Sequence, residues 1–209
     1  MTIFSDIITD DIEQQLNDPG QVIWTNEILF KYVTEAQNAI ILLGVDANII
    51  KADVTLDQDA MQTIPPGGVR FIDILRNIGG GPVRKIEKKV MDEVIPTWMI
   101  DKTETEIEHY MFEAENPTIF WVYPSPSIAT MKVQLSYAAE VALITKDDDA
   151  IILSDIYLPA IKEFLLWRCL SMENENMAIS LATQHLQNFY TLLGKKYQGA
   201  QYLKAVMNE

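Results

Sequence analysis

The spacing of apolar residues changes twice along this chain, and this change constrains the fold more than any other feature of the sequence. Towards both ends, apolar residues recur every three or four positions, which places them on one face of a helix. Between about residues 50 and 145 they alternate with polar residues in short runs, as in half-buried strands. Turn-forming clusters such as Pro65-Pro66-Gly67-Gly68 separate these runs. The pattern predicts helices, then strands, then helices again.

The first helical stretch covers about residues 3–44. Its opening stripe predicts one helix as far as the break Asn17-Asp18-Pro19-Gly20, and the stripe consists of Ile3, Ile7, Ile8, Ile12 and Leu16. Thr25 is a candidate N-cap for a second helix, because its hydroxyl can accept a hydrogen bond from an early backbone N–H. Gly44 stands where a helix C-terminal glycine belongs, so the second helix is expected to end there.

The second helical stretch covers about residues 155–194. Asp155 is a candidate N-cap, and Pro159 would then lie in the first turn, where its missing N–H costs least. A further helix is expected to end at Gly194. Residues 195–209 remain as a short, mostly polar C-terminal extension.

Six runs between the helical stretches are expected to be strands: Lys51–Leu56, Val69–Leu75, Val83–Ile86, Glu106–Phe112, Thr118–Tyr123 and Met131–Tyr137. Short strands with frequent turns favour an antiparallel sheet or a small sandwich. The run Phe120–Tyr123 has no interleaved Lys or Arg, so a platform for stacking nucleic-acid bases is disfavoured. We expect instead a strand with one buried face and one interface face.

These elements predict the α+β class, as an antiparallel helical bundle of the N-terminal and two C-terminal helices with an inserted antiparallel β-sheet region. A single domain over residues 1–209 is expected to contain all of them. The β-rich insertion covers about residues 50–145 in this prediction, and residues 195–209 form the C-terminal extension.

The charge balance excludes several classes of protein. There are 30 acidic and 16 basic residues, and the formal net charge is −14. A general nucleic-acid binder needs a basic face to displace phosphate counterions, so that class is disfavoured. No run of 18 apolar residues occurs, and hence no membrane span and no membrane partner is predicted.

The residue types that carry chemistry do not form a recognisable motif. His109, His185 and Cys169 have no metal-ligand spacing, and Cys169 is expected to be a buried small apolar residue. Gly79-Gly80-Gly81 lacks the phosphate-loop pattern and predicts a turn, and Asp147-Asp148-Asp149 lacks calcium-loop spacing and predicts a solvated linker. We therefore predict no catalytic residue, no metal and no cofactor.

The basic residues are concentrated in one place: six of the 16 lie between Arg70 and Lys89. One interpretation is the exposed face of two strands. The other is an electropositive edge that meets an acidic surface of a neighbouring copy. For this edge the candidate subunit-interface residues are Arg70, Arg84, Lys85, Lys88 and Lys89.

Several phrases, taken in their order and spacing from about Trp24 to Gly194, resemble one family. They are Trp24 to Leu29 with Glu35 to Ile40, Ile64-Pro65, Ile74 to Asn77, Val83 to Ile86 with Met91-Asp92 and Pro96 to Trp98, Asn116 to Pro124, and Tyr157 to Arg168. This combination is similar to the head-to-tail adaptor, or connector, proteins of tailed bacteriophages. The sequence departs from that family at Tyr137 to Val141, where a proline is expected soon after the tyrosine, and at Pro159.

The resemblance implies a structural virion protein without enzymatic activity. Such adaptors form homo-oligomeric rings of about twelve copies, in the virion neck between capsid and tail. The partners it implies are the portal protein, a tail nozzle or tail tube protein, and passing viral DNA that is not bound sequence-specifically. The resemblance also implies that the ring assembles in the host cytoplasm. For the C-terminal extension, the resemblance implies a contact with the portal or a neighbouring copy. The candidate residues are Lys195, Lys196, Tyr197, Tyr202 and Leu203.

Two alternatives remain open at this point. One is another head- or tail-completion protein of similar build. The other is a small enzyme or ligand-binding domain, which would require a pocket with convergent polar groups and perturbed pKa values.

Overall fold

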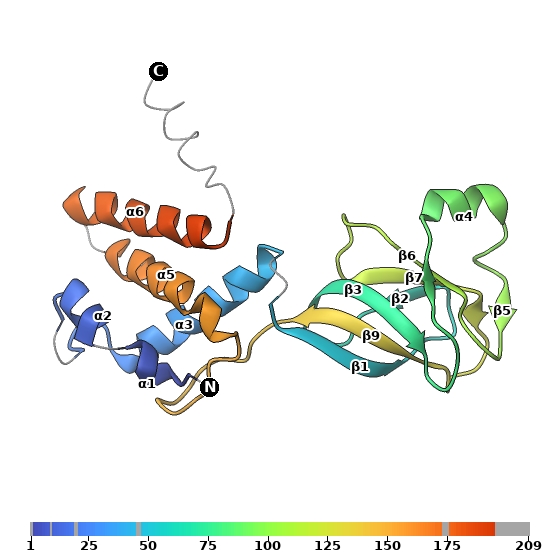
Figure 1. Cartoon of the computed structure of the whole chain (residues 1–209), viewed down its shortest axis with the longest axis horizontal. Coiled ribbons are helices and arrows are strands. Elements are labelled where there is room, and N and C mark those ends of the chain that lie inside the picture. The colour runs from blue at the N-terminus through green and yellow to red at the C-terminus, as the bar shows by residue number, and fades with distance from the viewer. Residues whose placement is uncertain (1, 9, 19–20, 45–46, 173–175, 195–209) are drawn as a thin grey trace, which may run out of the picture. The chain divides into compact units, whose positions relative to one another are not determined.

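The computed structural model describes residues 2–8, 10–18, 21–44, 47–172 and 176–194 (Figure 1). Its helices are α1 (Phe4–Ile7), α2 (Asp10–Gln15), α3 (Asn26–Leu42), α4 (Lys88–Val94), α5 (Leu158–Leu170) and α6 (Asn176–Leu192), with a 3₁₀ turn η1 (Asp155–Tyr157). Its strands are β1 (Ile49–Thr55), β2 (Met61–Thr63), β3 (Gly68–Asn77), β4 (Arg84–Lys85), β5 (Lys102–Thr103), β6 (His109–Phe112), β7 (Ile119–Tyr123), β8 (Ser125–Pro126) and β9 (Lys132–Ala139). The predicted mixed α+β class is confirmed.

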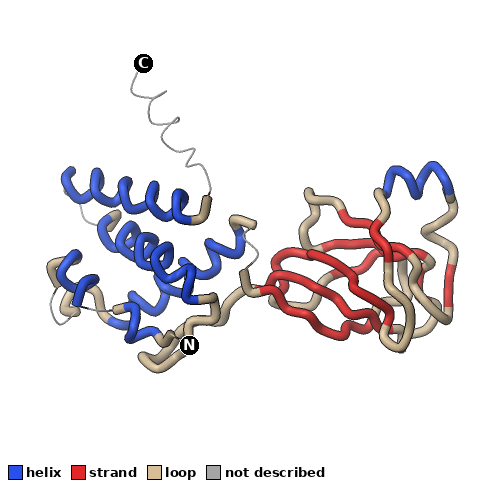
Figure 2. Tube along the Cα trace, in the orientation of Figure 1, coloured by secondary structure: helices blue, strands red, loops and turns tan. Residues whose placement is uncertain are grey.

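The chain divides into two compact units. The helical unit consists of Met1–Ala47 and Val141–Glu209, and the β unit consists of Asn48–Glu140. Figure 2 shows the described strands gathered in the β unit, which also contains α4, and the other helices gathered in the helical unit. The β unit therefore interrupts the helical unit in the sequence.

Polar side chains of helix α3 bind the segment that follows the β unit in the sequence. The Asn38 Oδ1 atom accepts a hydrogen bond from the Val141 N–H at 2.8 Å. The Gln37 Oε1 atom, fully buried, accepts hydrogen bonds from the Ile152 and Leu153 N–H groups at 3.0 and 3.3 Å. An unpaired buried amide is costly, so these bonds hold residues 141–153 in place on α3. Asn38 itself is half-buried.

Helix α5 packs between α3 and α6. On the α3 side, the Arg168 Nε atom lies 2.9 Å from Glu35 Oε2, and its guanidinium lies 4.8 Å from the centroid of the Tyr32 ring. On the α6 side, the rings of Phe164 and Phe189 meet edge to face at 5.2 Å. Aromatic pairs of this geometry stabilise a core beyond the area they bury.

The single helix predicted from Ile3 to Leu16 is wrong, since the structure has two short helices, α1 and α2. Helix α1 ends before Ile8, whose backbone angles (φ −81°, ψ 77°) are not helical. The N–H groups of Phe4 and Ser5 donate to the carbonyl oxygens of Asp149 and Asp147, and Ile3 forms a β-bridge with Ala150. These bonds satisfy N–H groups that the first turn of a helix leaves free, and they bind the start of α1 to a distant segment.

The two predicted N-caps also need correction. Thr25 does precede α3, but its side chain makes no capping hydrogen bond. Asp155 does not cap α5, because η1 intervenes and α5 begins at Leu158. Pro159 lies in the first turn of α5, as predicted, since a helix needs no N–H there.

The β unit contains a three-stranded sheet in the order β1-β9-β3 and a four-stranded sheet in the order β2-β7-β6-β4. All pairs in the first sheet are antiparallel. The expectation of a wholly antiparallel sheet is wrong at two short pairs, β4 with β6 and β5 with β8, which are parallel. The two larger sheets share one core, in which Phe71 of β3 stacks on Phe120 of β7 at 4.7 Å.

Strands β6 and β7 are buried on both faces. Alternate residues, such as Tyr110 and Phe120, enter the core between the two larger sheets. The residues between them, Met111 and Trp121, enter a second core with Met91 and Trp98, and these belong to α4 and the turn that follows it. The predicted interface face of Phe120–Tyr123 is therefore covered from within the chain.

Helix α4 was not expected from the sequence. The predicted strand Val83–Ile86 is present only as Arg84–Lys85, and the helix Lys88–Val94 follows it. The helix has one fully buried side chain, Met91, and the buried indole of Trp98 donates a hydrogen bond to Asp92 Oδ1 at 2.7 Å. Burial of Met91 and Trp98 against the sheet accounts for a helix this short, which would be unstable alone.

Candidate functional site

The predicted basic interface residues lie on three elements of the β unit. Arg70 belongs to β3, Arg84 and Lys85 to β4, and Lys88 and Lys89 to α4. The interpretation as the face of two strands is therefore wrong for the two lysines. Arg84, Lys85 and Lys89 are exposed, whereas Arg70 and Lys88 are half-buried.

Lys88 makes its contacts within the β unit. Its ammonium lies 4.6 Å from the centroid of the Trp121 ring and 3.6 Å from Glu113 Oε1. A cation over an aromatic face and near a carboxylate is already partly satisfied. Among the five candidate residues, the exposed charges that can meet a partner are those of Arg84, Lys85 and Lys89.

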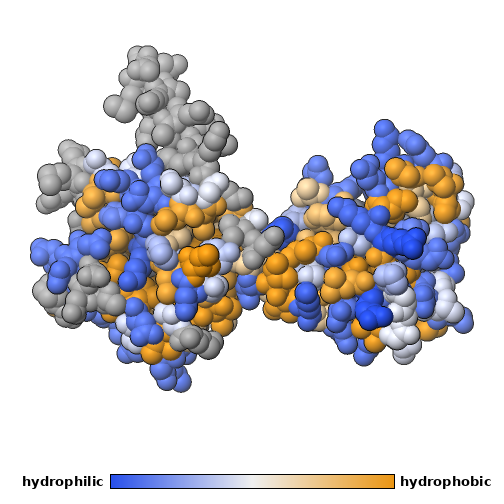
Figure 3. All heavy atoms as spheres, viewed as in Figure 1, coloured by the Kyte–Doolittle hydropathy of each residue, from blue (hydrophilic) through white to orange (hydrophobic). Residues whose placement is uncertain are grey.

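An apolar ridge lies beside these cations, and sequence reasoning missed it. We call it the α4 ridge: the exposed side chains of Val90, Val94, Met99 and Ile100. Figure 3 shows orange, hydrophobic atoms where Figure 1 places α4 and its following turn. The sequence does contain a signal for this ridge. The run that includes α4 and its following turn has several apolar residues, but only one of those in the helix, Met91, is buried. Exposed apolar clusters of this kind mark contact sites.

A second exposed apolar feature is the loop between α2 and α3. Val22 and Ile23 are 80% and 63% exposed, and we call this pair the loop tip. The carboxylate of Asp18 accepts hydrogen bonds from the N–H groups of Val22, Ile23 and Trp24 at 2.8–3.2 Å. Asp18 itself is only 5% exposed. A buried carboxylate that accepts several backbone N–H groups fixes the course of a loop.

A third feature is a hollow between the beginning of α5 and the end of α6. Its volume is about 170 Å³, and we call it the α5–α6 hollow. The lining consists of Ile156, Tyr157, Pro159, Ala160, Leu192 and Leu193. None of the lining residues that the structure describes is charged, so the hollow suits an apolar group. Sequence reasoning could not find it, because its residues come from segments more than 30 positions apart.

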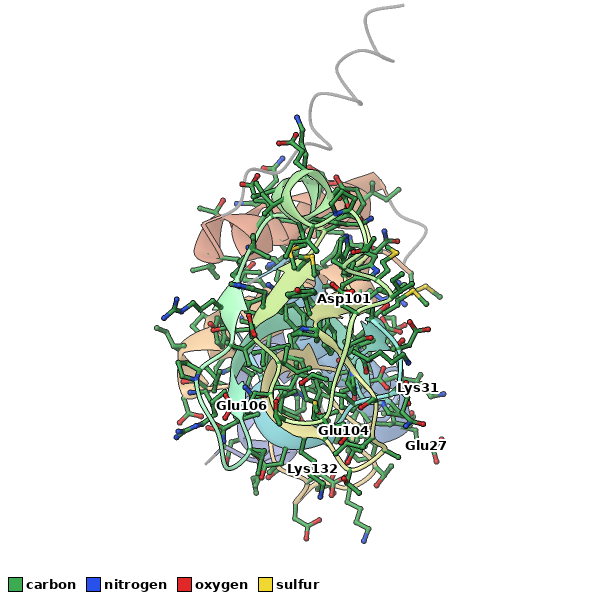
Figure 4. All side chains as sticks on the ribbon, turned by 90° about the vertical axis from the view of Figure 1, so that its right-hand side faces the viewer. Glu27, Lys31, Asp101, Glu104, Glu106 and Lys132 are labelled. Carbon is green, nitrogen blue, oxygen red and sulfur yellow. The ribbon has the colours of Figure 1, made fainter. Side chains whose placement is uncertain are left out.

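The β unit has a polar hollow of about 220 Å³. Glu104 and Lys132 both line it, and Figure 4 labels them near each other, with Glu106 alongside. Glu106 accepts a hydrogen bond from the Gly81 N–H at 3.4 Å, and Gly79 in the same turn has a φ of +80°. The turn predicted at Gly79–Gly81 is confirmed, and Glu106 helps to hold it.

The histidines and the cysteine have ordinary structural surroundings. His109 stacks on Tyr123 at 6.4 Å, and His185 Nδ1 lies 2.9 Å from Glu163 Oε2. Cys169 is fully buried in α5, as predicted. Among the described residues, no group of three or more His, Cys, Asp and Glu side chains is placed to hold a metal ion. None of the helices in the described part of the chain has the length and apolar content to cross a membrane.

The acidic triplet Asp147–Asp149 is more than a solvated linker, so that prediction needs correction. Asp149 Oδ2 accepts hydrogen bonds from the N–H groups of Thr145 and Lys146 at 2.7 and 3.0 Å. These bonds, with that from Thr145 the strongest cause, lower the pKa of the Asp149 carboxyl below its ordinary value. Asp147 accepts a hydrogen bond from the Asn26 side chain at 2.8 Å. The triplet therefore organises a turn of the helical unit.

The predicted contact residues of the C-terminal extension, Lys195, Lys196, Tyr197, Tyr202 and Leu203, lie outside the described residues. The described residues thus form three candidate contact surfaces: the exposed cations with the α4 ridge, the loop tip, and the α5–α6 hollow. All three suit contacts with protein surfaces.

Comparison with known proteins gives one result. The model of a protein family described as "SU10 adaptor protein" matches residues 2–207, which includes both units. No curated protein sequence matches the chain. The predicted resemblance to phage head-to-tail adaptors is confirmed at the level of the family.

Proposed function

Because the chain belongs to the SU10 adaptor protein family, a family of phage adaptor proteins, we propose that it forms the head-to-tail adaptor ring of a virion. The observation that carries this proposal is the family match over residues 2–207. In the proposal, the ring of about twelve copies docks beneath the portal, receives the tail nozzle or tail tube, and surrounds the path of the DNA. Its role is structural, and its place is the virion neck.

The charge of the chain supports a channel that does not hold DNA. With a net charge of −14, the chain as a whole repels phosphate. Binding to DNA requires a basic surface that releases counterions. A ring of such subunits would let DNA pass without sequence-specific contacts.

In this proposal, the helical unit is an antiparallel bundle that carries the inserted β unit, and residues 1–209 act as a single adaptor domain. Nine of the 16 basic residues belong to residues 48–140. We propose that the exposed cations of the β unit, Arg84, Lys85 and Lys89, meet acidic residues of the neighbouring copy, with Arg70 and Lys88 at the edge of that contact. Complementary charge of this kind selects partners and speeds encounter.

The proposal is tested by measuring mass in solution, first of the chain alone and then with the portal ring from the same genome. We expect a ring-sized assembly to form on the portal. A chain that leaves the portal unchanged at all concentrations would contradict the proposed function.

The charge contact is tested by a pair of variants with equal changes in charge. Arg84→Glu with Lys85→Glu should reduce the yield of rings, because both side chains are exposed in the basic region. Lys51→Glu with Lys132→Glu, also exposed in the β unit, is the matched control and should assemble normally. Equal yields from both variants would remove the charge contact from the proposal.

We also propose that residues 195–209 contact the portal. Deletion of Gln198–Glu209 should leave the two units folded and weaken binding to the portal. Unchanged binding of the truncated chain would exclude this role.

A further inference from the structure

We infer that neighbouring copies join through their helical units, with the loop tip of one copy, Val22 and Ile23, inserted into the α5–α6 hollow of the next. This inference rests on the proposed ring and specifies one of its contacts. Two observations support this inference. Apolar side chains are exposed on a loop that Asp18 holds, and an apolar hollow lies elsewhere on the same unit.

The loop tip is built to present its two side chains. Val22 and Ile23 are exposed, whereas Trp24, the next residue, is buried. The Asp18 carboxylate, itself buried, accepts all three N–H groups of residues 22–24. A loop fixed in this way loses little conformational freedom when it docks, and preorganisation of this kind favours binding.

The hollow matches the loop tip in chemistry and in size. The residues described in its lining are mostly apolar, and they include Ile156, which is 78% exposed, and Leu192, which is 55% exposed. Its volume of about 170 Å³ resembles that of an apolar protein cavity of roughly 150 Å³ that takes up benzene. A branched aliphatic side chain such as that of Ile23 fits a space of this size.

The two features lie at opposite ends of the helical unit. Figure 1 shows the loop between α2 and α3 at one end, and the beginning of α5 and the end of α6 at the other. The loop tip therefore cannot fill the hollow of its own copy. Two different patches that meet between copies form a heterologous interface, which closes into a ring when the rotation permits. In this inference, the occupant of the hollow is the loop tip of a second copy of this chain.

The contact is small. Two side chains bury much less than the roughly 800 Å² per partner of a stable protein interface. The contact alone does not hold free copies together. It becomes effective when copies stand side by side on a template, because each new contact is then effectively intramolecular.

Disulfide trapping tests the inference with the full chain. Ile23→Cys combined with Leu192→Cys places one thiol on each side of the contact, and the native Cys169 is fully buried and does not interfere. Under mild oxidation on the portal, we expect a ladder of trimers and larger species on non-reducing gels, and a much weaker ladder without the portal. Each single variant, with one accessible thiol per chain, must stop at dimers.

The matched control is Ile23→Cys with Leu181→Cys. Leu181 is also exposed, and it lies eleven residues before Leu192, on the same face of α6 but about 16 Å away along its axis. This pair should give no species beyond the dimer. A ladder from both pairs would mean random collision and would overturn the inference.

The outcomes separate this inference from the proposed function. If rings form on the portal and Ile23→Cys with Leu192→Cys gives no ladder, the inference is wrong and the proposed ring stands. A ladder without any binding to the portal supports the contact and contradicts the adaptor role. A ladder that appears only after deletion of Gln198–Glu209 would show that the chain's own extension fills the hollow, and the inference would be wrong.

A charged residue at the loop tip gives a second measurement. Ile23→Asp should reduce the yield of rings at least about tenfold, because a carboxylate would enter an apolar hollow. Ile23→Leu should assemble normally, since the apolar character is kept. Equal yields from the two variants would overturn the inference.

Discussion

The α4 ridge of the β unit and the loop tip of the helical unit both expose apolar side chains, but the chain holds them in different ways. The ridge stands on an apolar anchor, because Met91 and Trp98 beneath it are buried against Met111 and Trp121. The loop tip stands on a polar anchor, the carboxylate of Asp18. The two anchors differ in whether their side chains also belong to the core of their unit.

An apolar anchor is part of a core, so its removal also weakens the sheet that it covers. A polar anchor made by one carboxylate can be removed with smaller effects on the surrounding core. We therefore expect the ridge and the β unit to be lost together, whereas the loop tip can be loosened while the helical unit stays folded.

The largest effect is expected at the apolar anchor. Trp98→Ala should destabilise the β unit by roughly 3–5 kcal/mol, since it removes a fully buried aromatic side chain. Amide hydrogen exchange is the measurement: protection should fall throughout residues 48–140 and persist in α3 and α5. Loss of protection confined to residues 88–100 would show that the ridge and the sheet are independent, and the comparison would fail.

The polar anchor should give a smaller and more local effect. Asp18→Ala removes the acceptor of three backbone N–H groups, and we expect a loss of about 1–3 kcal/mol of stability in the loop. Amide exchange of residues 22–24 should rise at least about tenfold, with α3 and α5 unchanged. Asp6→Ala is the control, because Asp6 is exposed and accepts a single N–H bond, from Ile3. A global loss of protection in Asp18→Ala would contradict the local role of this carboxylate.

The stability of the β unit should also depend on high pH, through Tyr110. Burial, and next a hydrogen bond to Asp73, raise the pKa of Tyr110 well above its ordinary value of 10.0. The folded β unit therefore keeps this hydroxyl protonated when the unfolded chain loses the proton. Stability is fully present below pH 10 and falls above it, by up to about 1.4 kcal/mol for each pH unit, until the pH passes the folded pKa.

Tyr110→Phe tests this dependence. The variant should be less stable than the original by about 0.5–1.5 kcal/mol near neutral pH, because a hydrogen bond is lost. Between pH 10 and 11 its stability should fall less steeply. Urea unfolding at a series of pH values is the measurement, and parallel pH profiles for the two proteins would refute the assignment.

The comparison also shows which parts of the fold could be predicted from the sequence. Strands such as β1 and β9 follow clear alternation, because one face enters the core between the sheets. Helix α3 follows a long apolar stripe with a turn on either side. In these elements the local pattern and the tertiary packing agree, and local pattern alone was enough.

The remaining elements depend on contacts between distant segments. Helix α4 has a single buried side chain in seven residues, so no periodic stripe marks it. The start of α1 is held by hydrogen bonds to Asp147 and Asp149, more than 140 positions away. The candidate surfaces follow the same rule: the cations were visible as a cluster in the sequence, but the exposure of Ile23 depends on Asp18. The α5–α6 hollow depends on how two helices meet.

The smallest effect is expected where α3 meets α5, at the pair Glu35 and Arg168. The Arg168 Nε atom lies 2.9 Å from Glu35 Oε2, but both side chains are partly exposed, at 32% for Arg168 and 47% for Glu35. Water and salt screen such a pair, so Glu35→Gln should cost less than about 1 kcal/mol, and less still in 1 M salt. Arg168→Gln should cost more, because it also removes the guanidinium from the Tyr32 ring. If urea unfolding gave the two variants equal costs, the ring contact would add nothing to the ion pair, and the helical unit would have a second polar anchor besides that of its loop.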